Sequence, residues 1–437
     1  MGNTIKYIIQ FLLGKSVSSK VAAKIGYTAD ESEFKNYAIV IVPSDFFAPD
    51  IYGSEQSLPQ LPLKSWEETP FLFGEASQYE KNKTTVLKAD LIASAYFLIS
   101  RYEEYARKTV RDIHGRFPGK ESLPYRAGFI DRPLVDDYGR LLRQMLRNKG
   151  FDAPDPPKEI SKIFLTHDVD KISHFRNIRG FAGGVLRGLR HPKEAQVAFA
   201  SFFGTLKNDP WYTFPYIFKI NTSLQKALGT ERCECVAFMG AGKGLRKEDL
   251  PFANLAHPDF KTVLKACKRH NYTIGLHTSY QAGITPEIIA DEKHKLERGA
   301  KRKITYNRNH FLCSREPEDM LELIKAGITD DFTMSYADMA GFRLGTCRPV
   351  KWINPATRKV TNLKLHSLEI MDMSLSDKRY MFMNSHDAEM YCYQLADNVK
   401  NCNGELVLLW HNTSLEHTPR SYHRDLYKKF IKYLQPK

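Results

Sequence analysis

The chain has 437 residues, of which 42% are hydrophobic and 26% are charged, and its formal net charge is +14. These proportions are close to those of globular proteins, so they exclude a disordered, collagen-like or coiled-coil chain as a description of the whole. The length suits two domains, or one large domain with a smaller partner.

The positive charge is spread unevenly. Residues 1–150 hold 21 basic and 18 acidic residues, which is 21 − 18 = +3, and the remaining +11 belongs to 151–437. Such a surplus can favour an anionic partner such as an acidic polysaccharide or anionic lipid, although a solvated basic surface explains it more simply. No stripe of Lys and Arg interleaved with stacking aromatics occurs, so we expect no nucleic-acid partner.

The cysteines and the first residues bear on the compartment. There are seven cysteines, an odd number, and no CxxC pair, which fits reduced thiols in a cytosolic protein. The first apolar run is short, is interrupted by Gln10 and is followed by no small-residue cleavage site, so it predicts an amphipathic helix rather than a signal peptide. No run approaches the ~18–20 apolar residues that span a bilayer. We therefore expect a cytoplasmic protein without a transmembrane segment; the oligomeric state is left open.

In chain order, the first 150 residues mix strand and helix patterns. They predict a buried strand at 37–43, a Pro-punctuated loop at 54–64, a helix at 90–107 capped by Asp90, and a helix at 132–150 that ends in Lys and Gly.

A connector follows at 151–159, FDAPDPPKE, where three prolines stand among Asp and Lys. It predicts an N-terminal α/β domain of unknown function at 1–150 and a second domain at 160–437. In the second domain, strand patterns alternate with helices, which implies a parallel sheet, open or closed into a barrel. The predicted strands are 162–170, 233–240, 272–280 and 405–414, and the predicted helices are 260–271, 316–327 and 385–404.

Three of the predicted strands end in ionisable side chains. The first ends in Asp168 and Asp170, the second in His277 and the third in His411. Catalytic groups of parallel α/β barrels sit at the carboxyl ends of strands, and alternation places Asp168 and Asp170 on one face. Paired carboxylates beside a His from a neighbouring strand can bind one divalent metal and supply a general base. Taken alone, each residue has a simpler explanation: the Asp residues could be a solvated strand end or a helix cap, and each His could be a structural, hydrogen-bonded residue.

Two further segments carry weaker signals. Residues 239–244, MGAGKG, lack the spacing and the final Ser or Thr of a phosphate-binding loop. The segment 171–193 carries basic residues and no acidic one, which leaves open contact with a membrane surface or an anionic glycan, beside the simpler alternative of a solvated loop and helix. Its basic residues are Lys171, Arg176, Arg179, Arg187, Arg190 and Lys193.

The ordered motifs LTHDVD, GLHTSY, NRNHFL, DDFTMSYADMAGFRLGT and LLWHN resemble those of the polysaccharide deacetylases, the NodB-like enzymes. The similarity covers about 160–415 and implies a distorted, incomplete (β/α) barrel. Upstream, SRYEEY, HGRFPGK and FIDRPLVDDY resemble the N-terminal domain of a divergent bacterial subgroup of these proteins, a domain for which we know no assigned function.

The resemblance implies a role for each matching residue. Asp168 matches the general base, Arg308 the Arg that orients the base, and His411 the His that protonates the leaving amine. Asp170 resembles the metal-binding carboxylate, displaced by one residue from the commoner adjacent Asp-Asp arrangement, and His277 matches the first metal His. Asp331 falls in the motif that supports a later strand. The implied reaction is attack of water on an acetamide carbonyl. The implied cofactor is a divalent metal ion, with Zn²⁺ as the first candidate.

One position departs from the family pattern. The family usually places a second metal His four residues after the first, and here that position is Gln281. His310, two residues after Arg308, is the candidate substitute as third ligand, whereas alternation points His167 away from Asp168 and Asp170.

These observations predict a hydrolase that removes N-acetyl groups, or in second place O-acetyl groups, from a sugar or glycan intermediate. Gln281 keeps two alternatives open: a catalytically silent glycan-binding protein on the same barrel, and a metal-free hydrolase of a non-sugar C–N bond. Metal analysis separates the first function from the other two.

Overall fold

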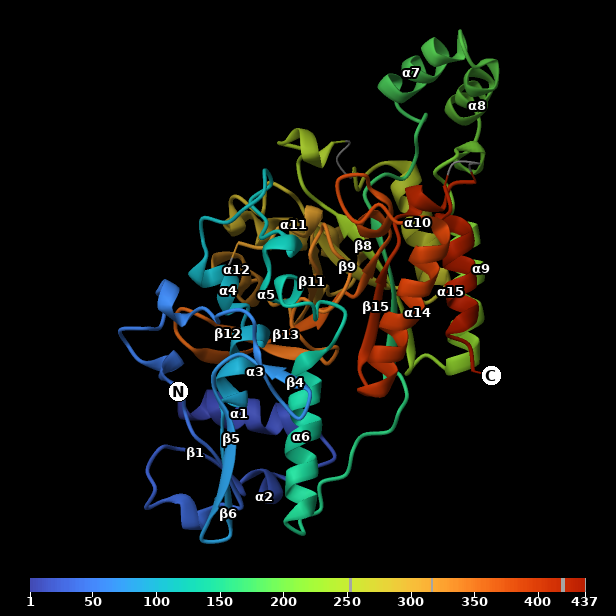
Figure 1. Ribbon diagram of the computed structural model, residues 1–437. Coiled ribbons are helices and arrows are strands. Elements are labelled where there is room, and N and C mark those ends of the chain that lie inside the picture. Colours follow the sequence, from blue (N-terminus) through green and yellow to red (C-terminus); the bar gives the residue numbers. More distant parts are fainter. Residues whose placement is uncertain (251–253, 316, 418–420, 437) are drawn as a thin grey trace. The chain divides into compact units, whose positions relative to one another are not determined.

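A computed structural model of the protein describes residues 1–250, 254–315, 317–417 and 421–436 (Figure 1). The chain forms two compact units. The first contains Met1–Ser161, Met334–Glu369 and Leu395–Leu406, and the second contains Lys162–Thr333, Ile370–Gln394 and Val407–Lys437. Within the described ranges, no helix combines the length and the apolar character needed to cross a membrane.

The first unit contains a sheet with the strand order β1-β2-β6-β5. β1 (Ile25–Tyr27), β2 (Ile39–Ile41) and β6 (Thr84–Ala89) run parallel, and β5 (Gly74–Lys81) pairs antiparallel with β6. A separate antiparallel pair is formed by β3 (Lys64–Trp66) and β4 (Thr69–Phe71). The helices are α1 (Gly2–Leu13), α2 (Ser19–Ala22), α3 (Leu91–Ile99), α4 (Tyr102–Ala106), α5 (Leu123–Arg126) and α6 (Leu134–Asn148).

The single helix predicted over 90–107 is wrong, because the chain forms α3 and α4 with a break between them. Asp90 caps α3 as expected, since its side chain accepts a hydrogen bond from the backbone N–H of Ala93. The break is at Arg101, whose φ of 55° is left-handed. The buried carboxylate of Glu104 accepts hydrogen bonds from the guanidinium groups of both Arg101 and Arg343. This charge-assisted group holds the chain in the broken form.

Two later segments belong to the first compact unit, although the sequence pattern assigned them to the barrel. They include the antiparallel pair β12 (Val350–Asn354) and β13 (Lys359–Ser367). The hydroxyl of Thr4 donates to the carbonyl of Arg358, and the backbone N–H of Lys351 donates to the hydroxyl of Tyr7. Bonds between such distant segments leave no trace in a local pattern. Independent folding of 1–150 stays a prediction.

The second unit carries strands in the order β11-β10-β9-β8-β7-β15-β14. Neighbours from β7 to β11 pair in parallel, as do β14 and β15. The strands are β7 (Lys162–Val169), β8 (Cys233–Gly240), β9 (Thr273–Thr278), β10 (Tyr306–Asn309), β11 (Asp330–Met334), β14 (Ile370–Met371) and β15 (Glu405–Leu409). The helices are α7 (Ile178–Gly188), α8 (Pro192–Phe203), α9 (Phe214–Leu228), α10 (Pro258–Arg269), α11 (Ile289–Ala300), α12 (Glu318–Lys325), α13 (Asp372–Ser376), α15 (His423–Tyr433) and the first part of α14 (Ser385–Asn401), whose residues from Leu395 on belong to the first unit.

The α/β class predicted from the alternating pattern is confirmed. The strands predicted at 162–170 and 233–240 are β7 and β8, and the helix predicted at 316–327 is α12, with residue 316 outside the described ranges. Among the strands that the structure describes, the order of the sheet does not return to its start, which is consistent with an incomplete barrel. The specific NodB type of barrel stays a prediction.

Candidate active site

Strand register brings the predicted residues to one edge of the sheet in the second unit. Arg308 on β10 lies opposite His277 on β9, and His277 lies opposite Gly240 on β8. The pairing of β7 with β8 continues this row, so that Asp170 comes level with Gly240. Because glycine has no side chain, the row leaves space between Asp170 and His277.

Asp168 is held by Arg308, and both side chains are buried. Nη1 of Arg308 donates to Oδ1 of Asp168 over 2.9 Å and to the hydroxyl of Thr166 over 2.7 Å. Nε of Arg308 donates to the carbonyl of Phe332, and the guanidinium lies 4.4 Å from the ring centroid of Phe238. Burial lowers the pKa of Arg308, and the charge of Asp168 offsets this only in part. The contacts fix the carboxylate by Oδ1 and turn Oδ2 toward His277, whose Nε2 lies 3.7 Å away.

Asp170, His277 and His310 form a compact group of potential metal ligands, with one ligand atom of each within 4.8 Å of the others. Oδ1 of Asp170 lies 3.1 Å from Nε2 of His277 and 3.8 Å from Nε2 of His310. Ligands that each lie ~2.0–2.1 Å from one tetrahedral ion are about 3.3 Å apart, between these two distances. Oδ1 of Asp170 and Nε2 of His277 are buried, and neither has a hydrogen-bond partner in the described chain. The donor set and its unpaired atoms fit a divalent cation.

The other ring nitrogen of each histidine is engaged, which fixes the tautomer. Nδ1–H of His277 donates to the backbone carbonyl of Arg308 over 2.9 Å, and Nδ1 of His310 lies 3.3 Å from Oδ1 of Asp249. The lone pair of Nε2 is thereby left to face Asp170, as in histidines that bind metals. Burial acts to lower the pKa of His277, but the negative charges of Asp168 and Asp170 outweigh it, and the pKa is raised.

Asp249 was missed by the sequence analysis. It ends a 3₁₀ turn, Lys247–Asp249, and its carboxylate also accepts hydrogen bonds from the backbone N–H groups of Tyr280 and Gln281 over 2.6 and 3.1 Å. Burial acts to raise the pKa of Asp249, and the hydrogen bonds from His310 and these N–H groups lower it further than burial raises it. Asp249 lies in a charged turn, 61 residues from His310 in the chain, and nothing in the sequence of that turn points to a contact with His310.

Gln281 lies outside the ligand group, although it stands where the resemblance leads one to expect a metal His. Its carbonyl accepts from Nε of Arg246 over 2.9 Å, and its amide donates to the hydroxyl of Thr285 over 2.9 Å. The structure brings His310, and not Gln281, beside Asp170 and His277.

His411 pairs with Asp372, a second residue that the sequence analysis missed. Nδ1 of His411 lies 2.8 Å from Oδ1 of Asp372, and the backbone N–H of His411 donates to Oδ2 over 2.8 Å. Burial acts to lower the pKa of His411, but the charge and hydrogen bond of Asp372 raise it to about 10. Nε2 of His411 lies 3.8 Å from Oδ2 of Asp170, which places the imidazole beside the ligand group. The strand before Asp372, β14, has only two residues, so the sequence carried little signal for it.

Two other ionisable residues of the motifs are structural. His167 is buried, with Nδ1 2.7 Å from the carbonyl of Trp410 and Nε2 2.9 Å from the amide of Asn221, and burial lowers its pKa to about 4. Its ring points away from Asp168 and Asp170, as strand alternation predicts. Asp331 accepts hydrogen bonds from Asn307 and Thr333 and supports β10 and β11.

The ligand group opens into a cavity of about 440 Å³ in the second unit. Its lining combines the ionisable side chains with apolar ones, and includes Asp170, His277, His310, His411, Trp211 and Met373. A volume of ~300–1,000 Å³ is typical of small-molecule sites.

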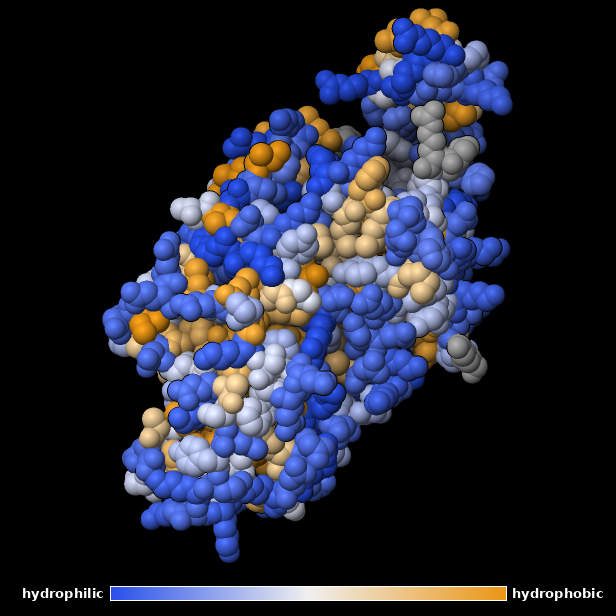
Figure 2. All heavy atoms as spheres, viewed as in Figure 1, coloured by the Kyte–Doolittle hydropathy of each residue, from blue (hydrophilic) through white to orange (hydrophobic). Residues whose placement is uncertain are grey.

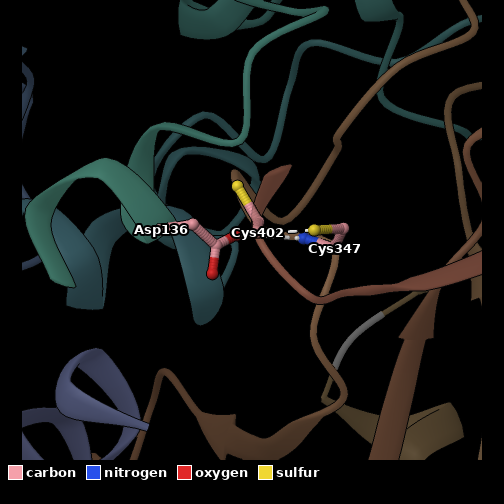
Figure 3. Close-up of side chains that lie close together, drawn as sticks. All are labelled: Asp136, Cys347 and Cys402. Atoms are coloured by element: carbon pink, nitrogen blue, oxygen red, sulfur yellow. Dashed lines mark hydrogen bonds between the residues drawn. The ribbon is translucent and has the colours of Figure 1, made fainter. Parts of the chain in front are cut away.

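A second group of possible ligands lies in the first unit. Figure 3 shows Asp136 on α6 close to Cys347 and Cys402, and one ligand atom of each lies within 4.8 Å of the others. The sequence analysis did not foresee this group.

Comparisons with known proteins leave the family of the whole chain open. Residues 2–151 match a family model described as "Family of unknown function (DUF7033)". No curated protein matches the chain. A structure described as a "putative polysaccharide deacetylase from Mycobacterium smegmatis" is similar, with 12% identity and a TM-score of 0.40, over 64% of this chain and 86% of that one. A 4-alpha-glucanotransferase from Thermococcus litoralis is similar with 11% identity and a TM-score of 0.34, over 65% of this chain and 38% of that one. At these scores neither similarity bears on function.

Proposed function

We propose that the protein is a metal-dependent hydrolase that removes N-acetyl groups, or in second place O-acetyl groups, from a sugar or glycan. The observation that carries the proposal is the convergence of a buried carboxylate, a His–Asp pair and a three-residue ligand group at one cavity. The members lie at or just after the carboxyl ends of strands, with Asp168 and Asp170 both at the end of β7, which is where α/β barrels carry their chemistry.

Asp168 would act as the general base. Its Oδ1 is occupied by Arg308, so Oδ2 is the atom that could take a proton from water as the water attacks the amide carbonyl. Arg308 would be a positioning residue. Its hydrogen bond fixes the orientation of the Asp168 carboxylate, and Arg308 lies opposite His277 in the sheet.

His411 would act as the general acid. Its raised pKa keeps the imidazole protonated at neutral pH, and Asp372 fixes the ring by Nδ1 so that Nε2 carries the proton to be donated. Transfer of that proton to the sugar nitrogen releases the amine, and acetate leaves with the oxygen taken from water.

Asp170, His277 and His310 would hold the divalent cation, for which Zn²⁺ suits a carboxylate with two imidazoles. When bound, such an ion supplies a Lewis acid that polarises the acetyl carbonyl and lowers the pKa of water. Three protein ligands leave a position open, as catalytic zinc sites require.

The test measures acetate release from N-acetylated chitooligosaccharides by the zinc-loaded protein and by Asp168→Asn. We expect release by the native protein, and a loss of ~10²–10⁴-fold in the variant, which removes the base while leaving the three ligands. Oligosaccharide binding without acetate release would instead favour the silent glycan-binding alternative. Activity that survives removal of the metal by a chelator would contradict metal dependence.

A further inference from the structure

A helical hairpin leaves the rim of the cavity and returns to it. It consists of α7 and α8, and is named here the α7–α8 hairpin. The segment that contains it begins after Lys171 and ends before Trp211, and both of these residues line the cavity. Figure 1 shows the two helices lying beside each other.

Small residues make part of the contact between the two helices. A Cβ added at Gly188 would lie 2.3 Å from Cβ of Ala195, and one added at Gly184 would lie 2.7 Å from Cβ of Ala198. At these two positions the helices approach closely, and a side chain larger than the one present would not fit.

The bulky apolar residues of the hairpin face outward. The exposed fraction is 80% for Ile178, 81% for Leu189 and 72% for Phe203, with Leu186 and Phe199 also exposed. Figure 2 shows hydrophobic and hydrophilic surface side by side over the α7–α8 hairpin. Large apolar side chains that stay exposed on two neighbouring helices mark a surface that a partner covers.

Aromatic side chains add to this surface. The ring of Phe181 contacts those of Phe199, Phe202 and Phe203, with centroid distances of 5.1, 4.4 and 5.5 Å. These rings form one cluster across the two helices, so the exposed side chains of Phe199 and Phe203 are held in place rather than scattered.

Cations are interleaved with the apolar residues. Residues 171–208 contain one acidic residue, Glu194, and it forms an ion pair with Arg187. Arg179, Arg190 and Lys193 have no carboxylate partner in the described chain and are exposed. A protein interface is depleted of charge at its apolar centre, whereas Lys and Arg beside exposed Leu and Phe suit the phosphates and acyl chains of an anionic bilayer.

We infer that the α7–α8 hairpin docks the protein on an anionic lipid bilayer, with its outer apolar side chains in the interfacial region and its cations on the lipid phosphates. Helices of 11 and 12 residues are about 16–18 Å long, far short of the ~30 Å of a hydrocarbon core, so the hairpin would lie on the membrane rather than span it. This inference stands apart from the proposed reaction. Its link to that reaction is that both ends of the segment line the cavity.

The experiment measures co-sedimentation of the full chain with vesicles of phosphatidylcholine alone and of phosphatidylcholine with 30% phosphatidylglycerol. We expect binding to the anionic vesicles to be at least about tenfold tighter, and to weaken as salt is raised, because each Lys or Arg near an anionic surface contributes and is screened beyond a Debye length.

Two variants remove the two parts of the surface. Ile178→Ser with Leu189→Ser removes apolar contact, and Arg190→Glu with Lys193→Glu reverses charge; each should lower binding to anionic vesicles at least about tenfold. The matched controls are Ile113→Ser, at a site 91% exposed in the first unit, and Lys35→Glu, and both should bind as the native chain does. Since all the substituted side chains are exposed, thermal unfolding should be unchanged.

Three results would overturn the inference. They are equal binding to the two kinds of vesicle, hairpin variants that bind like the native chain, and a change of oligomeric state in the variants with unchanged vesicle binding. The last would identify the surface as a contact between copies of this chain. None of these results depends on whether acetate is released, so failure of the proposed reaction is recorded separately.

Discussion

Two groups of three potential metal ligands occur among the described residues, and their surroundings distinguish them more than their spacing. One is Asp170, His277 and His310, and the other is Asp136, Cys347 and Cys402. In each group the ligand atoms lie within 4.8 Å of one another. Distance alone therefore does not tell which of the two could bind a cation.

The carboxylate of Asp136 is fully engaged by protein groups. Arg348 forms an ion pair with Oδ1, and Oδ2 accepts a hydrogen bond from the hydroxyl of Thr346 over 2.8 Å. Burial raises the pKa of Cys347 well above its usual value, and the neighbouring Cys402 and Asp136 raise it further, so the thiol stays protonated. Zinc binds thiolates, and a guanidinium already supplies the positive charge that an ion would bring.

In the other group the ligand atoms face one another, with Oδ1 of Asp170 3.1 Å from Nε2 of His277, and among the described residues no Lys or Arg forms an ion pair with Asp170. Oδ1 of Asp170 and Nε2 of His277 are buried without a hydrogen bond in the described chain, and the second nitrogen of each histidine is held by a carbonyl or a carboxylate. The difference teaches that ligand types close together indicate a metal only where the neighbours orient the ligands and leave their lone pairs unpaired.

The largest effect expected is loss of bound zinc in His277→Ala and in His310→Ala. Each substitution removes one of three ligands, and Asp170 with a single imidazole is too few for a stable site. Metal analysis of the purified variants provides the measurement, with Gln281→Ala and Cys347→Ser as controls that should retain zinc. Full retention in His310→Ala, with loss only in His277→Ala, would leave His310 a substrate or positioning residue.

A catalytic effect comes next. Asp168→Asn should lower acetate release ~10²–10⁴-fold, and His411→Ala should do the same, because each removes a group that moves a proton. Asp136→Asn is the matched control, and its rate per folded molecule should equal that of the native chain. Near-native turnover in either catalytic variant would show that the roles are assigned wrongly.

A smaller effect is expected at Asp249, which orients His310 without joining the ligand group. Asp249→Asn should weaken zinc binding ~10–100-fold, as loss of a partner behind a metal ligand typically does. Competition with a chromogenic chelator measures the affinity. Unchanged affinity would mean that the 3.3 Å contact with Nδ1 of His310 does not set the orientation of that ring.

The sequence was most informative where the local pattern and the sheet register agree. Asp168, Asp170, His277 and His411 lie at or shortly after the carboxyl ends of buried strands in a parallel sheet, and their side chains meet because parallel strands end at the same edge. Asp372 obeys the same rule, but β14 before it has only two residues, which is too short for a strand pattern to be recognised.

The parts that could not be predicted depend on contacts between distant residues. Arg101 breaks a helix that its local sequence favours, because Arg343, 239 residues from Glu104 in the chain, binds the same carboxylate. Asp249 reaches His310 from a turn with no periodic pattern. Similarly, 334–369 belong to the first compact unit through hydrogen bonds to the first helix, a type of contact that propensity and periodicity do not encode.

The smallest effect is expected at Cys402. This residue belongs to the group of Asp136, Cys347 and Cys402, so its substitution tests whether that group binds a metal. This thiol is half-buried, and its neighbours among the described residues include the thiol of Cys347. Cys402→Ser keeps the shape of the side chain and replaces a weak hydrogen-bonding group by a stronger one, so the free energy of unfolding should change by less than ~1 kcal/mol. Denaturant unfolding measures this change, and zinc content should equal that of the native chain. Two results would show that Asp136, Cys347 and Cys402 bind a cation after all. One is a lower zinc content in Cys402→Ser than in the native chain, and the other is a large loss of stability in this variant that is seen with metal present and not after a chelator has removed it. The unpaired lone pairs around Asp170 would then no longer distinguish the two groups.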